Sequence, residues 1–225
     1  MILMKLLSVD IGIKNLAHCL FEVQDSVRIL DWDVLDVTDL CHCGKRAIGK
    51  LHQEYYCKLH FPTKSSDVRD YCEKRSIVGT LSEMKAVLKR EFVQVESSLI
   101  QYGKGVIQKY ASLDPDIVIV ENQIGPLAST MKAMQGIVIQ YWLMRGVKVE
   151  IISSSNKLKL FHSEKTTYSQ RKKLSIEYTL KLLALNSIEA TFSGHTKKDD
   201  LADTFLQGVW YLQKVNCGLL KINCS

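Results

Sequence analysis

The chain lacks any uninterrupted apolar run of about 18 residues, the length that a membrane-spanning helix needs. Its first residues lack the charged segment and cleavage site of a secretory signal, and also the Arg-rich amphipathic pattern of a transit peptide. Only 3 prolines and no low-complexity tract occur in its 225 residues. We therefore expect a cytoplasmic or nuclear protein without a membrane partner, folded as a single domain over residues 1–225.

The 7 cysteines form an odd number, which without a secretory signal argues against a disulfide framework and favours reduced thiols. Two short motifs, C-x-C at Cys41 and C-x-x-H at Cys57, bring soft ligands together in pairs that suit tetrahedral Zn²⁺. The polar segment between them is too short to make its own core, and such segments are often held by a metal. We predict a structural zinc-binding insertion at residues 41–60. Its expected ligands are Cys41, Cys43, Cys57 and His60, with His42, His52 and Cys72 as spare candidates and unliganded loop cysteines as the alternative.

Positive charge is in modest excess, with a net charge of +6 and a sequence pI of 8.9. It concentrates in residues 157–173, where one acid, Glu164, stands among Lys157, Lys159, Lys165, Arg171, Lys172 and Lys173. A solvated helix face normally alternates in sign, and this segment does not. We expect it to contact phosphate groups.

Two apolar stretches end in a carboxylate. Residues 4–9 lead into Asp10, which Gly12 follows at a turn, and the β-branched run at 117–120 leads into Glu121. A carboxylate that ends a buried strand is costly unless it is solvated, paired or metal-bound. A turn aspartate and a capping glutamate are the alternatives, but two acids in the same position favour a functional site.

A third acidic motif begins a helix near the end of the chain. Thr196 with Asp199 fits a capping box, which predicts a helix start there. Asp200 and Asp203 are spaced i, i+3 and so lie on one side of the first turns. Their mutual repulsion is relieved by the helix N-terminus or by a divalent cation, and we favour the cation.

The remaining pattern alternates strands and helices. We expect strands at 5–10, 15–23, 27–37, 116–121 and 147–152, and helices at 76–110, 127–145 and 168–185.

Three motifs in this order resemble the RuvC-type Holliday junction resolvases, and more narrowly their poxviral and yeast mitochondrial branch. They are Ser8–Gly12, Ile119–Gln123 and Lys197–Asp203. The resemblance covers about residues 5–212 apart from the Cys/His insertion. It implies an α/β, ribonuclease H-like fold: a mixed five-stranded sheet flanked by helices, with the insertion after the third strand. It also implies a homodimer that nicks two strands of a four-way DNA junction symmetrically and, by analogy, a viral source.

The resemblance also assigns site residues. Asp10, Glu121, Asp200 and Asp203 match an acidic tetrad that binds two Mg²⁺ ions, with Mn²⁺ as a substitute. We expect Asp10 to bridge the metals, with Glu121 on one side and the two later aspartates on the other. Lys157 and Lys172 match the family's catalytic lysines loosely, so Lys159 or Lys173 are alternatives. The other cations of 157–173 would hold flanking phosphates of branched DNA, and no small-molecule substrate is implied.

Three other functions compete with this interpretation. Another nuclease of the same fold, acting on RNA or RNA–DNA hybrids, would use the same four acids. A sugar kinase or actin-like ATPase also begins with an Asp-Ile-Gly turn, but it needs two lobes and a Gly-rich adenosine motif that 225 residues do not accommodate. A non-catalytic zinc-containing DNA-binding module would bind DNA without cutting it.

Overall fold

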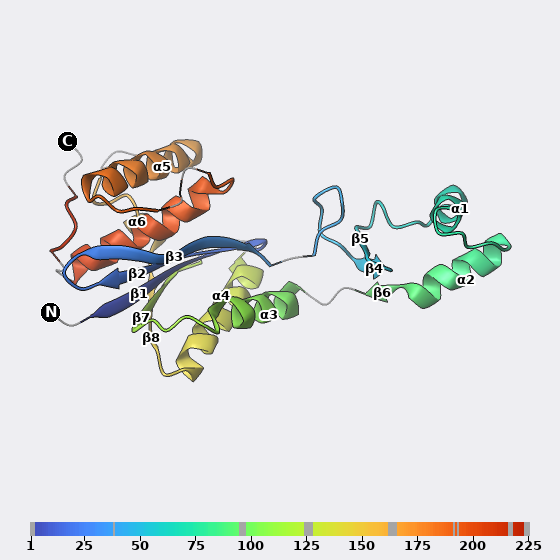
Figure 1. Cartoon of the computed structure of the whole chain (residues 1–225), viewed down its shortest axis with the longest axis horizontal. Helices are drawn as coiled ribbons and strands as arrows, with labels where there is room; N and C mark the ends of the chain where they lie inside the picture. The colour runs from blue at the N-terminus through green and yellow to red at the C-terminus, as the bar shows by residue number, and fades with distance from the viewer. Residues whose placement is uncertain are drawn as a thin grey trace. The chain divides into compact units, whose positions relative to one another are not determined.

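The computed structural model describes residues 3–37, 39–94, 98–123, 128–161, 166–190, 192, 194–215 and 218–222. The chain divides into two compact units. Unit 1 comprises Met1–Asp36 and Tyr102–Ser225, and unit 2 comprises Val37–Gln101, which lies in the sequence between the third strand and helix α3 (Figure 1).

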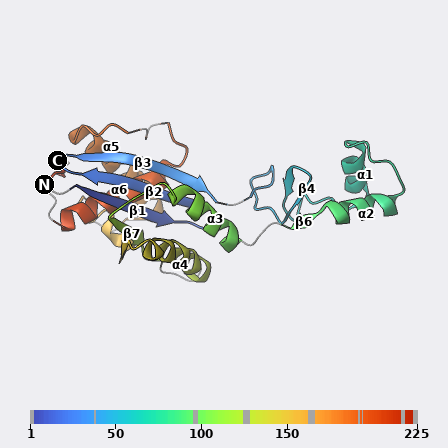
Figure 2. The same ribbon diagram turned by 60° about the horizontal axis from the view of Figure 1, so that its bottom comes forward.

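Unit 1 is built on a five-stranded mixed sheet. Its strands are β1 (Met4–Ile11), β2 (Asn15–Val23), β3 (Val27–Asp36), β7 (Ile117–Glu121) and β8 (Lys148–Ile152), in the order β3-β2-β1-β7-β8 (Figure 2). The first three strands pair antiparallel, whereas β1, β7 and β8 run parallel. This topology confirms the ribonuclease H-like sheet that the sequence predicts.

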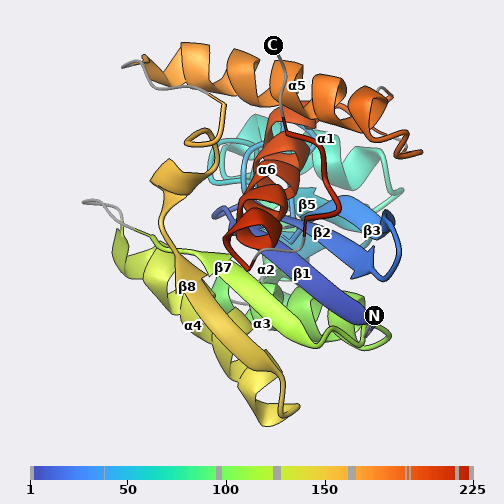
Figure 3. The ribbon, with the colours of Figure 1, turned by 90° about the vertical axis from the view of Figure 1, so that its left-hand side faces the viewer.

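Helices cover both faces of this sheet, as Figure 3 shows. On one side lie α5 (Tyr168–Leu185) and α6 (Lys198–Lys214), and on the other α4 (Ala128–Met144) and α3 (Ser98–Tyr110) from Tyr102 onward. A 3₁₀ turn, η1 (Ser154–Asn156), follows β8. Among the residues that the structure describes, no helix combines the length and the apolar character that a membrane crossing requires.

Helix α6 is seated closely on the sheet. The indole N–H of Trp32 on β3 donates to the Leu201 carbonyl at 3.0 Å, and the buried Gln207 amide donates to the Val9 carbonyl of β1 at 3.3 Å. Gly208 faces Phe21 of β2 so closely that a Cβ atom there would lie 2.2 Å from the ring. These contacts fix where the N-terminal turn of α6 lies relative to the end of β1.

Unit 2 has a small core of its own. Strands β4 (Gly49–Leu51), β5 (Glu54–Tyr56) and β6 (Val93–Gln94) form an antiparallel sheet in the order β5-β4-β6, beside helices α1 (Ser65–Glu73) and α2 (Leu81–Glu91). The buried side chains of its hydrophobic cluster are Leu51, Val68, Tyr71, Cys72 and Leu88.

The single helix predicted at 76–110 is wrong. The chain instead forms α2, then β6, then α3. Helix α2 begins at a capping box in which the Thr80 hydroxyl accepts from the Glu83 N–H, and β6 pairs with β4 through Gly49 and Lys50. This ladder to a distant strand overrides the local helical periodicity.

Candidate functional site

The first two predicted acids lie side by side at the ends of two neighbouring parallel strands. Val9 of β1 pairs with Val120 of the parallel strand β7, so Asp10 and Glu121 each follow by one residue at the same edge of the sheet. Both valines are fully buried, which holds the backbone of the two acids rigidly. After Asp10, the Gly12 N–H donates to the Asn15 carbonyl at 2.9 Å and closes the turn into β2.

Lys157, just after η1, brings the acids to one point. Its Nζ atom lies 2.5 Å from Glu121 Oε2, 2.8 Å from Asp203 Oδ2 and 3.7 Å from Asp10 Oδ2. The lysine side chain is only 10% exposed. Carboxylates from β1, β7 and α6 therefore surround a single nitrogen atom, although the sequence separates them widely.

The fourth acid, Asp200, lines the same cavity as the other three and feels the charge of Asp10. The Asn15 side-chain N–H donates to Asp200 Oδ2 at 3.1 Å. Burial, followed by the charges of Asp199 and Asp10, raises the pKa of Asp200, whereas the hydrogen bond from Asn15 acts in the opposite direction. Asp10 and Asp200 thus interact electrostatically.

The ammonium group does not balance this negative charge. Burial first, and then the charge of Asp10, raises the pKa of Glu121 to about 8 even though Lys157 acts to lower it. Burial would lower the pKa of Lys157, but the surrounding carboxylates outweigh it and raise that pKa above its ordinary value. Glu121 Oε2 pairs with the Lys157 ammonium, which it shares with Asp203 and Asp10. Clustered carboxylate oxygens with unmet negative charge are a donor set that fits Mg²⁺.

The cluster opens into a cavity of about 980 Å³. The lining residues include all four acids, Asn15, Gln123, Tyr168 and the predicted cations Lys157, Lys159, Arg171 and Lys172. Lys173 lines a smaller neighbouring pocket, and Lys165 lies outside the described residues. The basic segment is therefore divided: Lys157 turns inward to the acids, while the exposed Lys159 and Arg171 remain at the rim.

Lys172 has a different role from Lys157 in this structure. It forms an ion pair with Asp199, which lowers the pKa of that aspartate despite its burial. The capping box predicted for Thr196 and Asp199 is wrong, since α6 begins at Lys198 and no side chain caps it. Lys172, which is distant in the sequence, thus pairs with the Asp199 carboxylate that the local pattern assigns to the helix cap.

Some site residues escape the sequence analysis. Asn15 has no motif of its own, and only its place directly after the Asp10 turn could have indicated it. Gln135 of α4 donates to the Glu121 carbonyl at 2.9 Å. Tyr168, 67% exposed, lies with its ring 5.1 Å from the Lys172 ammonium at the cavity wall. Tyr168 and Lys172 are an i, i+4 pair on α5, which the sequence could have indicated, whereas no short-range pattern marks the contact of Gln135.

The Cys/His cluster assembles in unit 2 from the four residues predicted to bind zinc. The ligand atoms of Cys41, Cys43, Cys57 and His60 all lie within 4.8 Å of one another. Burial acts to raise the pKa of the Cys57 thiol, but the N–H groups of His60 and Leu59 and the neighbouring cysteines hold it below its usual value.

The three spare candidates lie outside this group. His42 stacks on the His60 ring with 4.4 Å between centroids, His52 contacts Glu91 at 3.2 Å, and Cys72 belongs to the core of unit 2. The five cysteines in the described part of the chain are all free thiols.

Known proteins show where this chain belongs. The model of the family described as Poxvirus A22 protein matches residues 81–215, more than half of the chain. An uncharacterized protein of Acanthamoeba polyphaga mimivirus is 29% identical in an alignment 197 residues long that covers 76% of this chain and 46% of that protein. The chain thus spans about half the length of this curated relative.

Two solved structures share the fold. The fowlpox virus resolvase, crystallised with its substrate Holliday junction DNA, is 17% identical, with a TM-score of 0.52 and coverage of 94% of this chain and 99% of the other. RuvC of Thermus thermophilus is 12% identical, with a TM-score of 0.50 and coverage of 97% and 99%. The family match covers the second and third of the three sequence motifs and confirms their resemblance to the poxviral branch: the chain belongs to the family described as Poxvirus A22 protein.

Proposed function

We propose that this chain is a Mg²⁺-dependent endonuclease that resolves four-way DNA junctions by hydrolysing one phosphodiester bond in each of two strands. The observation that carries the proposal is the convergence of acids from β1, β7 and α6 within 3.7 Å of one atom. Membership of a resolvase family supports DNA as the substrate, and the fowlpox relative was crystallised with a junction.

The acids would hold the metal ions. Asp10 lies between the other acids, so it is the proposed shared ligand, with Glu121 on one side and Asp200 and Asp203 on the other. When bound, two Mg²⁺ ions activate a water molecule and stabilise charge on the phosphate and on the leaving oxygen. Asn15 and Gln135 orient this ligand set, through the Asp200 carboxylate and the Glu121 carbonyl respectively.

Lys157 supplies the one positive charge at the centre of the acids. Its ammonium reduces the repulsion among them and holds their side chains together. If DNA enters the cavity, the scissile phosphate would lie beside the acids. It would therefore also lie within reach of the Lys157 ammonium. We propose this lysine as the principal catalytic lysine, because Lys172 pairs with Asp199, which is not one of the four acids.

The cations at the rim would bind DNA on either side of the cut. Lys159, Arg171 and Lys172 line the cavity, and Lys173 extends this surface into the adjoining pocket. Such phosphate contacts position a strand without reading its bases. A homodimer is part of the proposal, since two symmetric nicks require two such cavities.

The Cys/His cluster would hold a structural Zn²⁺ ion. Three thiolates and one imidazole make a closed tetrahedral set that leaves no position for a substrate. Unit 2 buries few side chains, and the metal would supply the stability that its small core does not.

The test is cleavage of a labelled four-way junction with Mg²⁺ and with EDTA. The wild-type protein should cut only with Mg²⁺, and Asp10→Asn should abolish cleavage while junction binding persists. Asp25→Asn, in the exposed β2–β3 turn, is the matched control and should cut at the wild-type rate. Faster cutting of an RNA–DNA hybrid than of the junction, or unchanged cutting by Asp10→Asn, would overturn the proposal.

A further inference from the structure

We propose that the Cys/His cluster of unit 2 presents a second DNA-binding surface, in which Lys45, Arg46 and Lys58 contact backbone phosphates. This inference rests on the proposed function in one respect, that DNA is the substrate of this chain. It concerns residues that neither belong to the acid cluster nor line its cavity. We call the three cations the knuckle surface.

Two tight turns bring these cations together. In the first, the Cys41 N–H donates to the Lys45 carbonyl at 2.9 Å and the Gly44 N–H donates to the Cys41 carbonyl at 2.8 Å. In the second, the N–H groups of His60 and Phe61 both donate to the Cys57 carbonyl. Because the four ligand atoms lie within 4.8 Å of one another, the two turns are adjacent. Lys45, Arg46 and Lys58 project from turns held around one centre.

The three cations are exposed and have no acidic partner. Within the described residues, none of them forms an ion pair, and the structure places all three in solvent. The one acid between Cys41 and Lys64 is Glu54, which is bound to Arg75 at 2.7 Å. Three thiolates and one Zn²⁺ would carry a single negative charge, so the knuckle surface would keep a positive excess.

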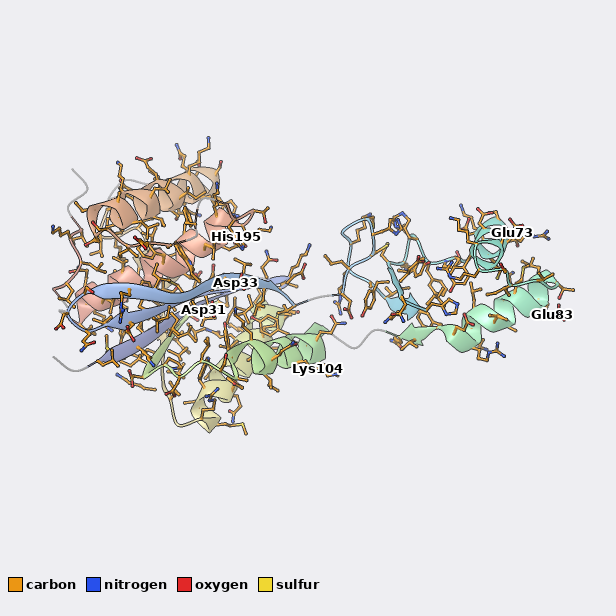
Figure 4. The ribbon with its side chains drawn as sticks, in the orientation of Figure 1. Asp31, Asp33, Glu73, Glu83, Lys104 and His195 are labelled. Atoms are coloured by element: carbon orange, nitrogen blue, oxygen red, sulfur yellow. The ribbon has the colours of Figure 1, made fainter. Side chains whose placement is uncertain are left out.

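The acids of unit 2 lie elsewhere. Five cations, Lys45, Arg46, Lys50, Lys58 and Lys64, occur between Cys41 and Lys64 against one acid, whereas residues 65–101 carry six acids and six cations. Figure 4 shows Glu73 on α1 and Glu83 on α2, at the helical end of the unit. The excess of cations in residues 41–64 differs from the alternating pattern of an ordinary solvated surface.

A polyanion is the partner that this chemistry fits. Cations on hydrogen-bonded turns lose little backbone freedom when they bind phosphates, and each contact releases condensed counterions. Leu59, 71% exposed between Lys58 and His60, is the feature that a protein partner would use instead. Because the surface carries three cations with this exposed apolar side chain, we assign it to DNA. A protein contact is one of the outcomes that the experiment distinguishes.

The test compares two triple variants of equal charge change in full-length protein. Lys45→Gln/Arg46→Gln/Lys58→Gln removes the knuckle surface, and Lys85→Gln/Lys89→Gln/Arg90→Gln removes two lysines and one arginine that are exposed on α2. Binding to a labelled four-way junction is measured by fluorescence anisotropy over a series of salt concentrations, with Asp10→Asn added to prevent cleavage. A third variant, Lys45→Arg/Arg46→Lys/Lys58→Arg, keeps the charges.

The knuckle variant should lose about tenfold or more in affinity near 0.1 M salt, and its slope of log K against log salt should fall by about 2–3, since each phosphate contact contributes roughly 0.9. The α2 variant and the charge-keeping variant should stay within about twofold of the parent. Equal slopes for the knuckle and α2 variants would overturn the inference. So would a change of oligomeric state with unchanged DNA binding, because that result assigns the surface to a protein contact.

The same proteins separate this inference from the proposed function. Without Asp10→Asn, the α2 variant should cut the junction within about twofold of the wild-type rate, whereas the knuckle variant should require a higher protein concentration for half-maximal cutting. A wild-type protein that binds the junction through the knuckle surface but never cuts it would refute the nuclease and leave this inference standing.

Discussion

The Lys157 ammonium and the Glu121 carboxylate lie 2.5 Å apart at the centre of the acid cluster. Neither group is near solvent: the lysine side chain is 10% exposed and the glutamate side chain 13%. Burial and neighbouring charge nevertheless raise the pKa of Glu121 to about 8, so this one cation does not satisfy the cluster.

Replacing Lys157 should destabilise the metal-free protein. Lys157→Met leaves the buried acids without their cation, and breaking such a pair costs about 3–5 kcal/mol. Mg²⁺ should restore part of this loss by supplying positive charge. Urea unfolding in EDTA and in Mg²⁺ measures both effects. Lys159→Met, an exposed lysine that contacts Asn156 at 2.8 Å, is the control and should change stability little. An equal loss with and without Mg²⁺ would contradict this role.

Mg²⁺ binding should depend on pH through Glu121. Its pKa of about 8 in the metal-free protein means that the folded chain holds a proton that a bound metal must expel. Apparent Mg²⁺ affinity should therefore rise with pH, by up to about tenfold per unit, and level off above pH 8. Calorimetry in buffers of different ionisation enthalpy measures the released proton. Glu121→Gln should release none, and a flat profile for the wild type would contradict the prediction.

The same pKa predicts the pH dependence of stability in EDTA. Because the folded pKa of Glu121 is raised, the folded state binds this proton more tightly than the unfolded chain does. The stability that Glu121 contributes is thus fully present below its ordinary pKa of about 4.5 and is lost as pH rises through 8. The free energy of unfolding of the wild type should fall relative to Glu121→Gln over that window. Parallel curves would refute this.

Asn15 should act through Asp200. Its hydrogen bond counteracts the burial and charge that raise the pKa of Asp200, so Asn15→Ala should raise that pKa further. Loss of such a supporting contact to a metal ligand typically costs 10–100-fold in metal affinity or activity. Cleavage rate against Mg²⁺ concentration measures it. Asp25→Asn, in the exposed β2–β3 turn, is again the control and should leave the curve unchanged.

Removing one zinc ligand should unfold unit 2 and leave unit 1 intact. Cys57→Ser breaks the four-ligand set that ties the two turns together, whereas the small core alone is a weak support. Zinc content and hydrogen exchange of residues 37–101 report the loss. Cys72→Ala, which removes a core thiol and no ligand atom, should keep its zinc. Retained protection without the metal would show that the core suffices.

Sequence reasoning predicts the sheet because local runs of apolar residues mark its strands. The apolar runs before Asp10 and Glu121 fix both the strands and the acids that end them, and the bounds of α5 are as expected. The contacts that sequence reasoning misses join residues that are far apart in the sequence. A charge run gives no sign that Lys157 turns inward, and nothing near Thr196 shows that Lys172 binds Asp199.

The contact between Gly208 and Phe21 shows how a residue in the core sets the position of the acids. The Phe21 ring is fully buried and packs on Phe205, so it has no room to retreat from an added methyl group. Any larger residue at 208 would lift α6, and with it Asp200 and Asp203, from strand β1. The spacing between the two halves of the acid cluster is therefore set by the absence of a side chain at Gly208, and on the proposed function a larger residue there would slow cleavage without changing any of the four acids.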